Sequence, residues 1–140
     1  MTEQEKQATD LNRELLELVH ALSQAGDFQA ALDTLVERAR RRVLCDGAAV
    51  MWLDGDYLEV VASRGATAPM RGLTLPVSQM GAARSALDSG RPVAVFDTAE
   101  DPAWEQVPGE EKVRAWLGVP LIADDWTLGL LEWTGSEPGL

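Results

Sequence analysis

Residues 113–133 constrain the fold of this chain more than any other stretch. Two apolar runs flank the polar pair Asp124-Asp125, and this pattern predicts two antiparallel strands joined by a tight hairpin. Apolar side chains occupy both alternating faces of the runs, so both faces of the hairpin should be covered rather than half exposed. A central sheet with helices on its two faces is the simplest way to cover them.

The other elements follow from turn residues and apolar patterns. Residues 28–43 carry an apolar stripe of helical period. Ser78 is expected to cap a second helix, which runs to about residue 88 and ends at Gly90. Short strands are predicted at residues 48–53, 57–63, 73–77 and 93–96. The expected fold is α+β, an antiparallel sheet of five or six strands with the N-terminal helices on one face and the short helix and a later acidic loop on the other.

The first 25 residues predict a separate helix with an apolar seam. The seam residues recur at steps of three and four, and they are Ala8, Leu11, Leu15, Leu18 and Leu22. One interpretation is a helix that packs on its own domain, because two heptads fall short of the three or four that define a coiled coil. The other is a homodimer interface formed by Leu11, Leu15, Leu18 and Leu22, which would carry a signal along the chain.

Residues 97–112 form a long, acidic loop broken by prolines and glycine. A loop of this length inside a compact domain is usually functional or mobile. Asp101-Pro102 should open a short helix that turns Trp104 inward. Adjacent carboxylates such as Glu110-Glu111 and Asp124-Asp125 lie on turns, so we interpret them as solvated caps rather than as a general acid and base.

Charge and composition exclude several classes of function. The 140 residues carry a formal net charge of −11, which would repel nucleic acid and an anionic membrane surface. No apolar run approaches the roughly 18 residues of a membrane span. The lone Cys45 excludes an internal disulfide and fits a reducing compartment. We therefore expect a cytoplasmic protein.

Residues for catalysis or metal binding are also scarce. The one histidine, His20, lies on the first helix and far in sequence from Cys45. No Ser-His-acid or Cys-His set can be assembled without it. Zinc and iron sites normally use several His or Cys ligands, and no acidic stretch has the spacing of a calcium loop. We predict a protein that is not an enzyme and has no metal or cofactor.

Two blocks of sequence resemble a known family. The first is a basic residue followed by Leu117-Gly118-Val119-Pro120-Leu121, a turn, and Leu128-Gly129-Leu130-Leu131. The second runs from Leu75-Pro76-Val77 through Met80-Gly81 to Gly90-Arg91-Pro92-Val93. Their order and spacing resemble the GAF domains of bacterial histidine kinases, phosphodiesterases and phytochromes. The resemblance implies a dimer or signalling helix at 1–25, a GAF domain at 26–136, and a tail at 137–140 that leads to a C-terminal helix or output domain.

In GAF domains the segment corresponding to residues 97–112 is the lid of a ligand pocket beside the sheet. The resemblance therefore implies a small-molecule site between lid and sheet, for which we expect the contact residues Trp52, Met80, Gly81, Trp104, Arg114 and Trp116. Three assignments have alternatives. Gly81-Ala82-Ala83 could offer free amides to a ligand or only let the helix lie close to the sheet. Trp104 could line the site or pin the loop, and Arg114 could contact the ligand or neutralise Glu110 and Glu111.

Missing residues narrow the subfamily. Residues 46–140 contain neither Cys nor His, which excludes bilin attachment at the usual place and leaves no pocket thiol or haem ligand. The Asn-Lys-Phe-Asp-Glu string of cyclic-nucleotide GAF domains is absent. We expect a sensory GAF domain of a signalling protein, such as a histidine kinase of a two-component system, that dimerises and binds an uncharged or cationic molecule non-covalently. The alternative is a ligand-free interaction module whose pocket is filled by Trp52, Trp104, Trp116 and Trp133.

Overall fold

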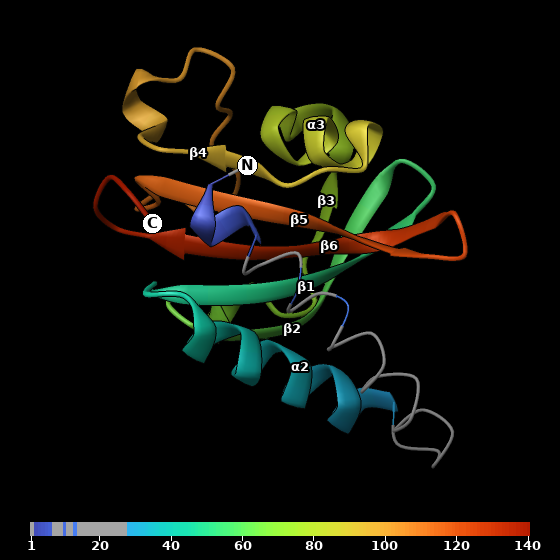
Figure 1. The fold of residues 1–140 in the computed structure, drawn as a ribbon. Coiled ribbons are helices and arrows are strands. Elements are labelled where there is room, and N and C mark those ends of the chain that lie inside the picture. Colours follow the sequence, from blue (N-terminus) through green and yellow to red (C-terminus); the bar gives the residue numbers. More distant parts are fainter. Residues whose placement is uncertain (1, 7–9, 11–12, 14–27) are drawn as a thin grey trace.

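The computed structural model describes residues 2–6, 10, 13 and 28–140. Within this part of the chain, six antiparallel strands form one sheet with the order β3-β2-β1-β6-β5-β4 (Figure 1). The strands are β1 Gly47–Asp54, β2 Tyr57–Gly65, β3 Thr74–Pro76, β4 Val93–Val95, β5 Ala115–Ala123 and β6 Trp126–Gly135. The expected α+β fold with a central antiparallel sheet is confirmed.

The hairpin of β5 and β6 lies inside the sheet, as predicted. β6 is paired with β1 on one side and β5 on the other, and β5 is paired with β6 and with the short β4. At the tip, Asp124 and Asp125 both have positive φ values, 49° and 68°. Two consecutive left-handed residues make the tight turn whose twist matches the flanking strands, and aspartate tolerates that conformation better than most residues.

Helix α2, Phe28–Arg42, covers one face of the sheet (Figure 1). Its apolar stripe packs on alternate residues of the central strands in a buried cluster that includes Leu32, Leu35, Val36, Ala39, Val119, Leu121, Leu131 and Trp133. The indole Nε1 of Trp133 donates a 2.8 Å hydrogen bond to the carbonyl oxygen of Ala39. The bond satisfies a buried donor and fixes the helix on the sheet. Among the described residues, no helix is long and apolar enough to cross a membrane.

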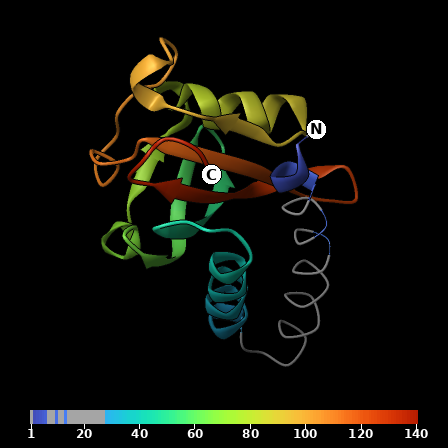
Figure 2. The ribbon, with the colours of Figure 1, turned by 60° about the vertical axis from the view of Figure 1, so that its left-hand side comes forward.

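Helix α3, Gly81–Ser89, and the lid, residues 97–112, cover the opposite face (Figure 2). Their buried cluster includes Met51, Leu58, Val60, Met80, Ala83, Ala86, Val95, Val107, Trp116 and Leu130. The sheet is therefore buried on both sides, which explains why its central strands are apolar at consecutive positions. Within the described residues the structure has the predicted layers, with α2 on one face and α3 and the lid on the other. The predicted position of the first helix stays a prediction, because most of residues 1–25 lie outside the described part of the chain.

Two local predictions are wrong. Ser78 does not cap α3, because a single 3-10 turn at Val77–Gln79 comes first and Met80 occupies the N-cap position without a side-chain bond. Asp101-Pro102 opens no helix; the Asp101 carboxylate instead accepts a 2.9 Å hydrogen bond from the Ala103 amide and stabilises a turn. The C-terminal prediction for α3 is confirmed, since Gly90 ends it in a left-handed conformation with φ 67°.

The predicted dimer seam lies outside the described residues. It comprises Ala8, Leu11, Leu15, Leu18 and Leu22, and His20 also lies in that part of the chain. Self-association through the first helix therefore stays a prediction.

Candidate ligand-binding site

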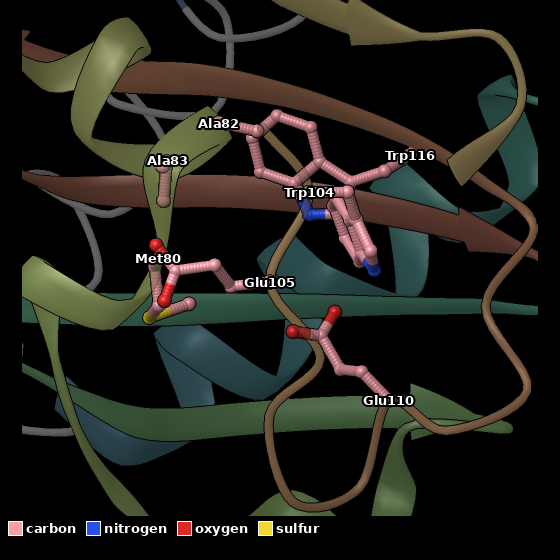
Figure 3. A pocket seen from close by; sticks show the side chains of 8 residues that line it. Met80, Ala82, Ala83, Trp104, Glu105, Glu110 and Trp116 are labelled. Carbon is pink, nitrogen blue, oxygen red and sulfur yellow. The ribbon is translucent and has the colours of Figure 1, made fainter. Parts of the chain in front are cut away.

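A pocket opens between the start of α3, the lid and strand β5 (Figure 3). Its lining residues are Met80, Gly81, Ala82, Ala83, Trp104, Glu105, Glu110 and Trp116. The interior has about 10 Å³ for the centre of a water-sized sphere, which is room for about one water molecule. A larger empty volume of about 230 Å³ includes the mouth open to solvent, so the smaller value describes what the closed pocket can enclose.

Trp116 forms the floor of the pocket from strand β5. Its side chain is only 2% exposed, and its indole lies across Gly118 on the same face of the strand. A Cβ atom at Gly118 would collide with Cη2 of that ring, so glycine is required for this position of the indole. The Gly118 of the Leu-Gly-Val-Pro-Leu motif is thus a packing requirement of the pocket floor.

Trp104 comes from the lid and meets Trp116. The two ring centroids lie 6.1 Å apart with planes tilted by 59°, an arrangement that aromatic pairs favour. Trp104 is partly buried, and the neighbouring lid residue Val107 is 4% exposed within the same cluster. Trp104 therefore both packs the lid against the sheet and lines the pocket, so the two alternatives for Trp104 are compatible.

The small residues at the start of α3 allow close packing. A Cβ atom at Gly81 would lie 2.8 Å from the carbonyl oxygen of Ala103 in the lid, and Ala83 is buried toward the sheet. Glycine at this position therefore lets the lid backbone rest on the helix. The first turn of α3 still borders the pocket, so a bond from its amides to a ligand remains a prediction.

Two buried carboxyl groups lie close together here, because Glu110 lines the pocket and the charge of Glu132, which bonds to the pocket residue Trp116, acts on Glu110. Glu110 is 2% exposed and Glu132, on β6, is fully buried. Oε2 of Glu132 accepts a 2.7 Å hydrogen bond from Nε1 of Trp116. Its other oxygen, Oε1, and Oε2 of Glu110 have no hydrogen-bond partner. Buried polar atoms are nearly always paired, so two unpaired carboxyl oxygens near one pocket require an explanation.

The prediction that Glu110 is a solvated cap is wrong. Turns in the lid direct it inward, because its amide bonds to the Val107 carbonyl and its own carbonyl accepts from the Val113 amide. The neighbouring Glu111 acts as the cap, with its carboxylate accepting from the Gly109 amide at 3.1 Å. Figure 3 shows the Glu110 carboxyl reaching from the lid toward the two indole rings.

Burial shifts the pKa of both carboxyl groups upward. Desolvation raises the pKa of Glu132 to about 7, although the hydrogen bond from Trp116 works in the opposite direction. Desolvation also raises the pKa of Glu110 well above its usual value, and the nearby charges of Glu132 and Glu111 add to the shift. Burial therefore favours the protonated form of both carboxyl groups more than in an exposed glutamate.

Glu132 was not among the predicted site residues, although the sequence contains a signal for it. An ionisable residue stands between Leu131 and Trp133 in an otherwise apolar strand. Leu131 and Trp133 face α2, so strand alternation directs Glu132 to the face of the lid. A charged residue at such a position is rarely buried without a partner or a function.

The structure brings together four of the six residues expected at the site, Met80, Gly81, Trp104 and Trp116. Trp52 lies elsewhere, because its neighbour Met51 faces the lid side and Trp52 packs on the α2 side. Trp133 also lies on the α2 side. The four tryptophans of the filled-pocket alternative are therefore divided between the two faces of the sheet.

Arg114 also lies apart from the pocket. Its Nε and Nη2 atoms each donate a 3.1 Å hydrogen bond to a different carboxylate oxygen of Asp97. This two-point contact lowers the pKa of the Asp97 carboxyl. Arg114 thus pairs with the first lid residue rather than with Glu110 or Glu111.

Cys45 lies on the α2 side of the sheet, away from the pocket. Its Sγ is 3.6 Å from the Arg40 carbonyl oxygen, and burial raises the pKa of the thiol. A thiolate is therefore disfavoured there. Among the residues that the structure describes, no three His, Cys, Asp or Glu side chains gather in a group able to hold a metal ion.

The GAF family model matches residues 27–138, most of the chain. The chain belongs to the GAF family. This assignment agrees with the sheet, the lid and the position of the pocket described above. The comparison with curated proteins finds no significant match.

Solved structures with the same fold have diverse roles. The GAF domain of a phosphoenolpyruvate-protein phosphotransferase from Coxiella burnetii is 23% identical, with a TM-score of 0.71 over 94% of this chain and 79% of the other. A free methionine-R-sulfoxide reductase from Neisseria meningitidis, in complex with its substrate, is 18% identical, with a TM-score of 0.69 over 99% and 79%. The blue-light absorbing form of the PixJ GAF domain from Thermosynechococcus elongatus is 28% identical, with a TM-score of 0.66 over 85% and 76%.

Proposed function

We propose that this GAF domain is a non-catalytic sensory module that binds a small molecule non-covalently beneath its lid. The observation that carries the proposal is the insertion of two lid side chains, Trp104 and Glu110, into the same pocket. Because these side chains form part of the pocket wall, a ligand bound there would contact the lid directly. Pocket occupancy is thereby linked to lid position, which a sensor can transmit.

The proposed setting is a cytoplasmic signal-transduction protein, such as a histidine kinase of a two-component system. In this proposal the N-terminal helix dimerises through Leu11, Leu15, Leu18 and Leu22 and carries the signal. The apolar spacing of these residues supports the proposal. Membership of the GAF family supports a regulatory role in general.

A catalytic role is disfavoured by the chemistry of the pocket. Two similar structures are methionine sulfoxide reductases, but the single thiol of this chain, Cys45, does not line the pocket and its pKa is raised by burial. The sequence has no Cys or His after residue 45. Among the described residues, the pocket is therefore lined by no thiol nucleophile and no imidazole base.

The second candidate is a ligand-free interaction module. The small interior of about 10 Å³ favours it, because the closed pocket holds about one water molecule. The unpaired carboxyl oxygens argue against it, since a pocket that only fills space would be expected to lack unpaired polar atoms.

A metabolite screen by thermal shift, run on wild type and Trp104→Ala, separates the two candidates. A sensory module should show ligands that raise the Tm of wild type, and the mutant should lose roughly 1–3 kcal/mol of binding free energy. Trp126→Ala is the matched control, because Trp126 is 74% exposed at the tip of the hairpin. Equal shifts in all three proteins would remove Trp104 from the site, and no shift with any compound would favour the ligand-free module.

A further inference from the structure

We propose that the pocket takes the primary ammonium group of a small organic cation, which Glu110 and Glu132 hold between their carboxyl groups. This inference rests on the proposed function and specifies its ligand class. A primary ammonium has three N–H donors and no acceptor. It therefore complements a site that presents unpaired acceptors.

The acceptors are buried carboxyl oxygens. Oε2 of Glu110 and Oε1 of Glu132 lack hydrogen-bond partners, while the other oxygen of Glu132 is held by Trp116. That bond fixes the Glu132 carboxyl and leaves Oε1 available. Glu110 lines the pocket and Glu132 is close enough for its charge to act on Glu110, so in the proposed complex one donor group contacts both carboxyl groups. Bonds to ionised carboxylates are stronger than neutral ones.

The size of the pocket selects the kind of cation. The interior has room for about one water molecule, and an ammonium group is close to water in size. A quaternary ammonium is larger and has no N–H to donate. An aliphatic stem attached to the nitrogen can extend along the apolar lining residues Met80, Ala82 and Trp104.

The charges around the pocket also favour a cation. The exposed Glu105 also lines the pocket, and the charge of Glu111 acts on Glu110. These two carboxylates add to the negative potential at the pocket. No Lys, Arg or His is among the described residues that line the pocket. The nearby cation Arg114 is held by Asp97. The net charge of −11 further attracts cations to the whole domain.

When no ligand is bound, protons neutralise the buried carboxyl groups in place of the ammonium ion. Burial disfavours two negative charges, so the empty site retains protons on its carboxyl groups. A bound ammonium ion would supply the missing positive charge and release a proton to solvent. Affinity should therefore rise with pH and fall about tenfold per pH unit below the pKa of the displaced proton.

The test is isothermal titration calorimetry with butylammonium chloride at about pH 6, where the buried carboxyl groups still hold protons to release, and at about pH 8, where protons compete least with the ammonium ion for the carboxylates. Two buffers of different ionisation enthalpy count the protons released. 1-Butanol is the uncharged probe of similar size, and tetramethylammonium is the cation without N–H donors. We expect butylammonium to bind with proton release and the other two probes to bind about tenfold or more weakly.

Variants locate the site. Glu110→Gln and Glu132→Gln keep the side-chain shape but remove one charge each, and each should weaken butylammonium binding about tenfold to a hundredfold. Glu59→Gln is the matched control, because it removes the same charge from an exposed residue of β2. Its neighbours Leu58 and Val60 face the lid side of the sheet, so the side chain of Glu59 points to the opposite face. This variant should bind butylammonium as wild type does. Thermal unfolding of each variant confirms that it is folded.

Each outcome decides the inference. Butylammonium binding that depends on both carboxyl groups supports it. Equal binding of 1-butanol, no heat with butylammonium, or equal affinity in Glu110→Gln and Glu59→Gln would overturn it. If those results come with uncharged metabolites that stabilise wild type in the thermal screen, the sensory function stands and only the ligand class is wrong. If no metabolite binds either, the proposed function fails too.

Discussion

Nε1 of Trp116 donates a 2.7 Å hydrogen bond to Oε2 of Glu132 across the central hairpin. Gly118, which lies directly opposite Glu132 in the strand register, leaves the space that the Trp116 indole crosses to reach it. One aromatic residue therefore forms the floor of the pocket and orients a buried carboxyl group beside it.

The unfolding free energy should decrease as the pH rises from about 5 to about 8. The folded pKa of Glu132 is about 7, above the ordinary value of 4.5, so the folded state binds more protons than the unfolded state between these values. That contribution is fully present below the unfolded pKa and is lost as the pH passes the folded pKa, with an upper size of about 3 kcal/mol. The measurement is urea denaturation across this pH range.

Glu132→Gln should flatten this pH dependence, because an amide cannot ionise. Glu110→Gln should flatten it as well, since the pKa of Glu110 is raised by burial and by the charge of Glu132. Asp46 and Asp97 do not interfere, because their pKa values are lowered and they titrate in more acidic solution. A slope that is the same in wild type and in both variants would show that the carboxyl groups are not responsible.

Gly118→Ala should destabilise the domain by roughly 1–3 kcal/mol, since the added methyl group collides with the Trp116 ring. The same substitution in a Trp116→Leu background should cost much less, because the ring is gone. The double-mutant cycle from chemical denaturation measures the difference. Equal costs in both backgrounds would mean that the glycine is needed for another reason.

Arg114→Ala should leave binding to the pocket unchanged, because the guanidinium pairs with Asp97 and does not line the site. The same mutation should raise the pKa of Asp97 toward its ordinary value, since the hydrogen bond from Arg114 is the main cause of its lowered pKa. Carboxyl NMR titration gives the pKa, and calorimetry with butylammonium gives the affinity. A loss of affinity comparable to that of Glu110→Gln would return Arg114 to the site.

Leu15→Glu combined with Leu18→Glu should convert a dimer into a monomer if the N-terminal seam is the interface. These residues lie outside the described part of the chain, so the prediction rests on apolar spacing alone. Light scattering of wild type and the double variant is the measurement. An unchanged mass would assign the seam to packing within one chain.

The fold was predictable because its strongest signals are local. Consecutive apolar residues in β5 and β6, with an Asp-Asp turn between them, fix a hairpin that must be covered on both faces. The cap of α3 was mispredicted because Ser78 has the right side chain but the chain first makes a 3-10 turn. The capping preference of a single residue does not determine where a helix begins, because the local path of the backbone can move the start by a few residues.

The site was predictable only in part because tertiary contacts decide it. Trp104 and Trp116 were expected on the basis of family resemblance, and they do meet. Trp52 lies on the α2 face of the sheet, because side chains alternate along a strand and its neighbour Met51 faces the lid. Glu110 and Glu132 lie in different elements and approach each other only when the lid folds onto the sheet. Their proximity could therefore not be predicted from either position alone.

The measurement that tests the account most directly is a two-dimensional NMR titration of the five tryptophan indole groups with butylammonium. Trp104 and Trp116 line the pocket, whereas Trp52 and Trp133 pack on the α2 side and Trp126 is exposed. We predict that the indole resonances of Trp104 and Trp116 move together with increasing ligand, while the other three stay in place. Movement of Trp52, Trp126 or Trp133 without Trp104 and Trp116, or no movement at all, would contradict the proposed site.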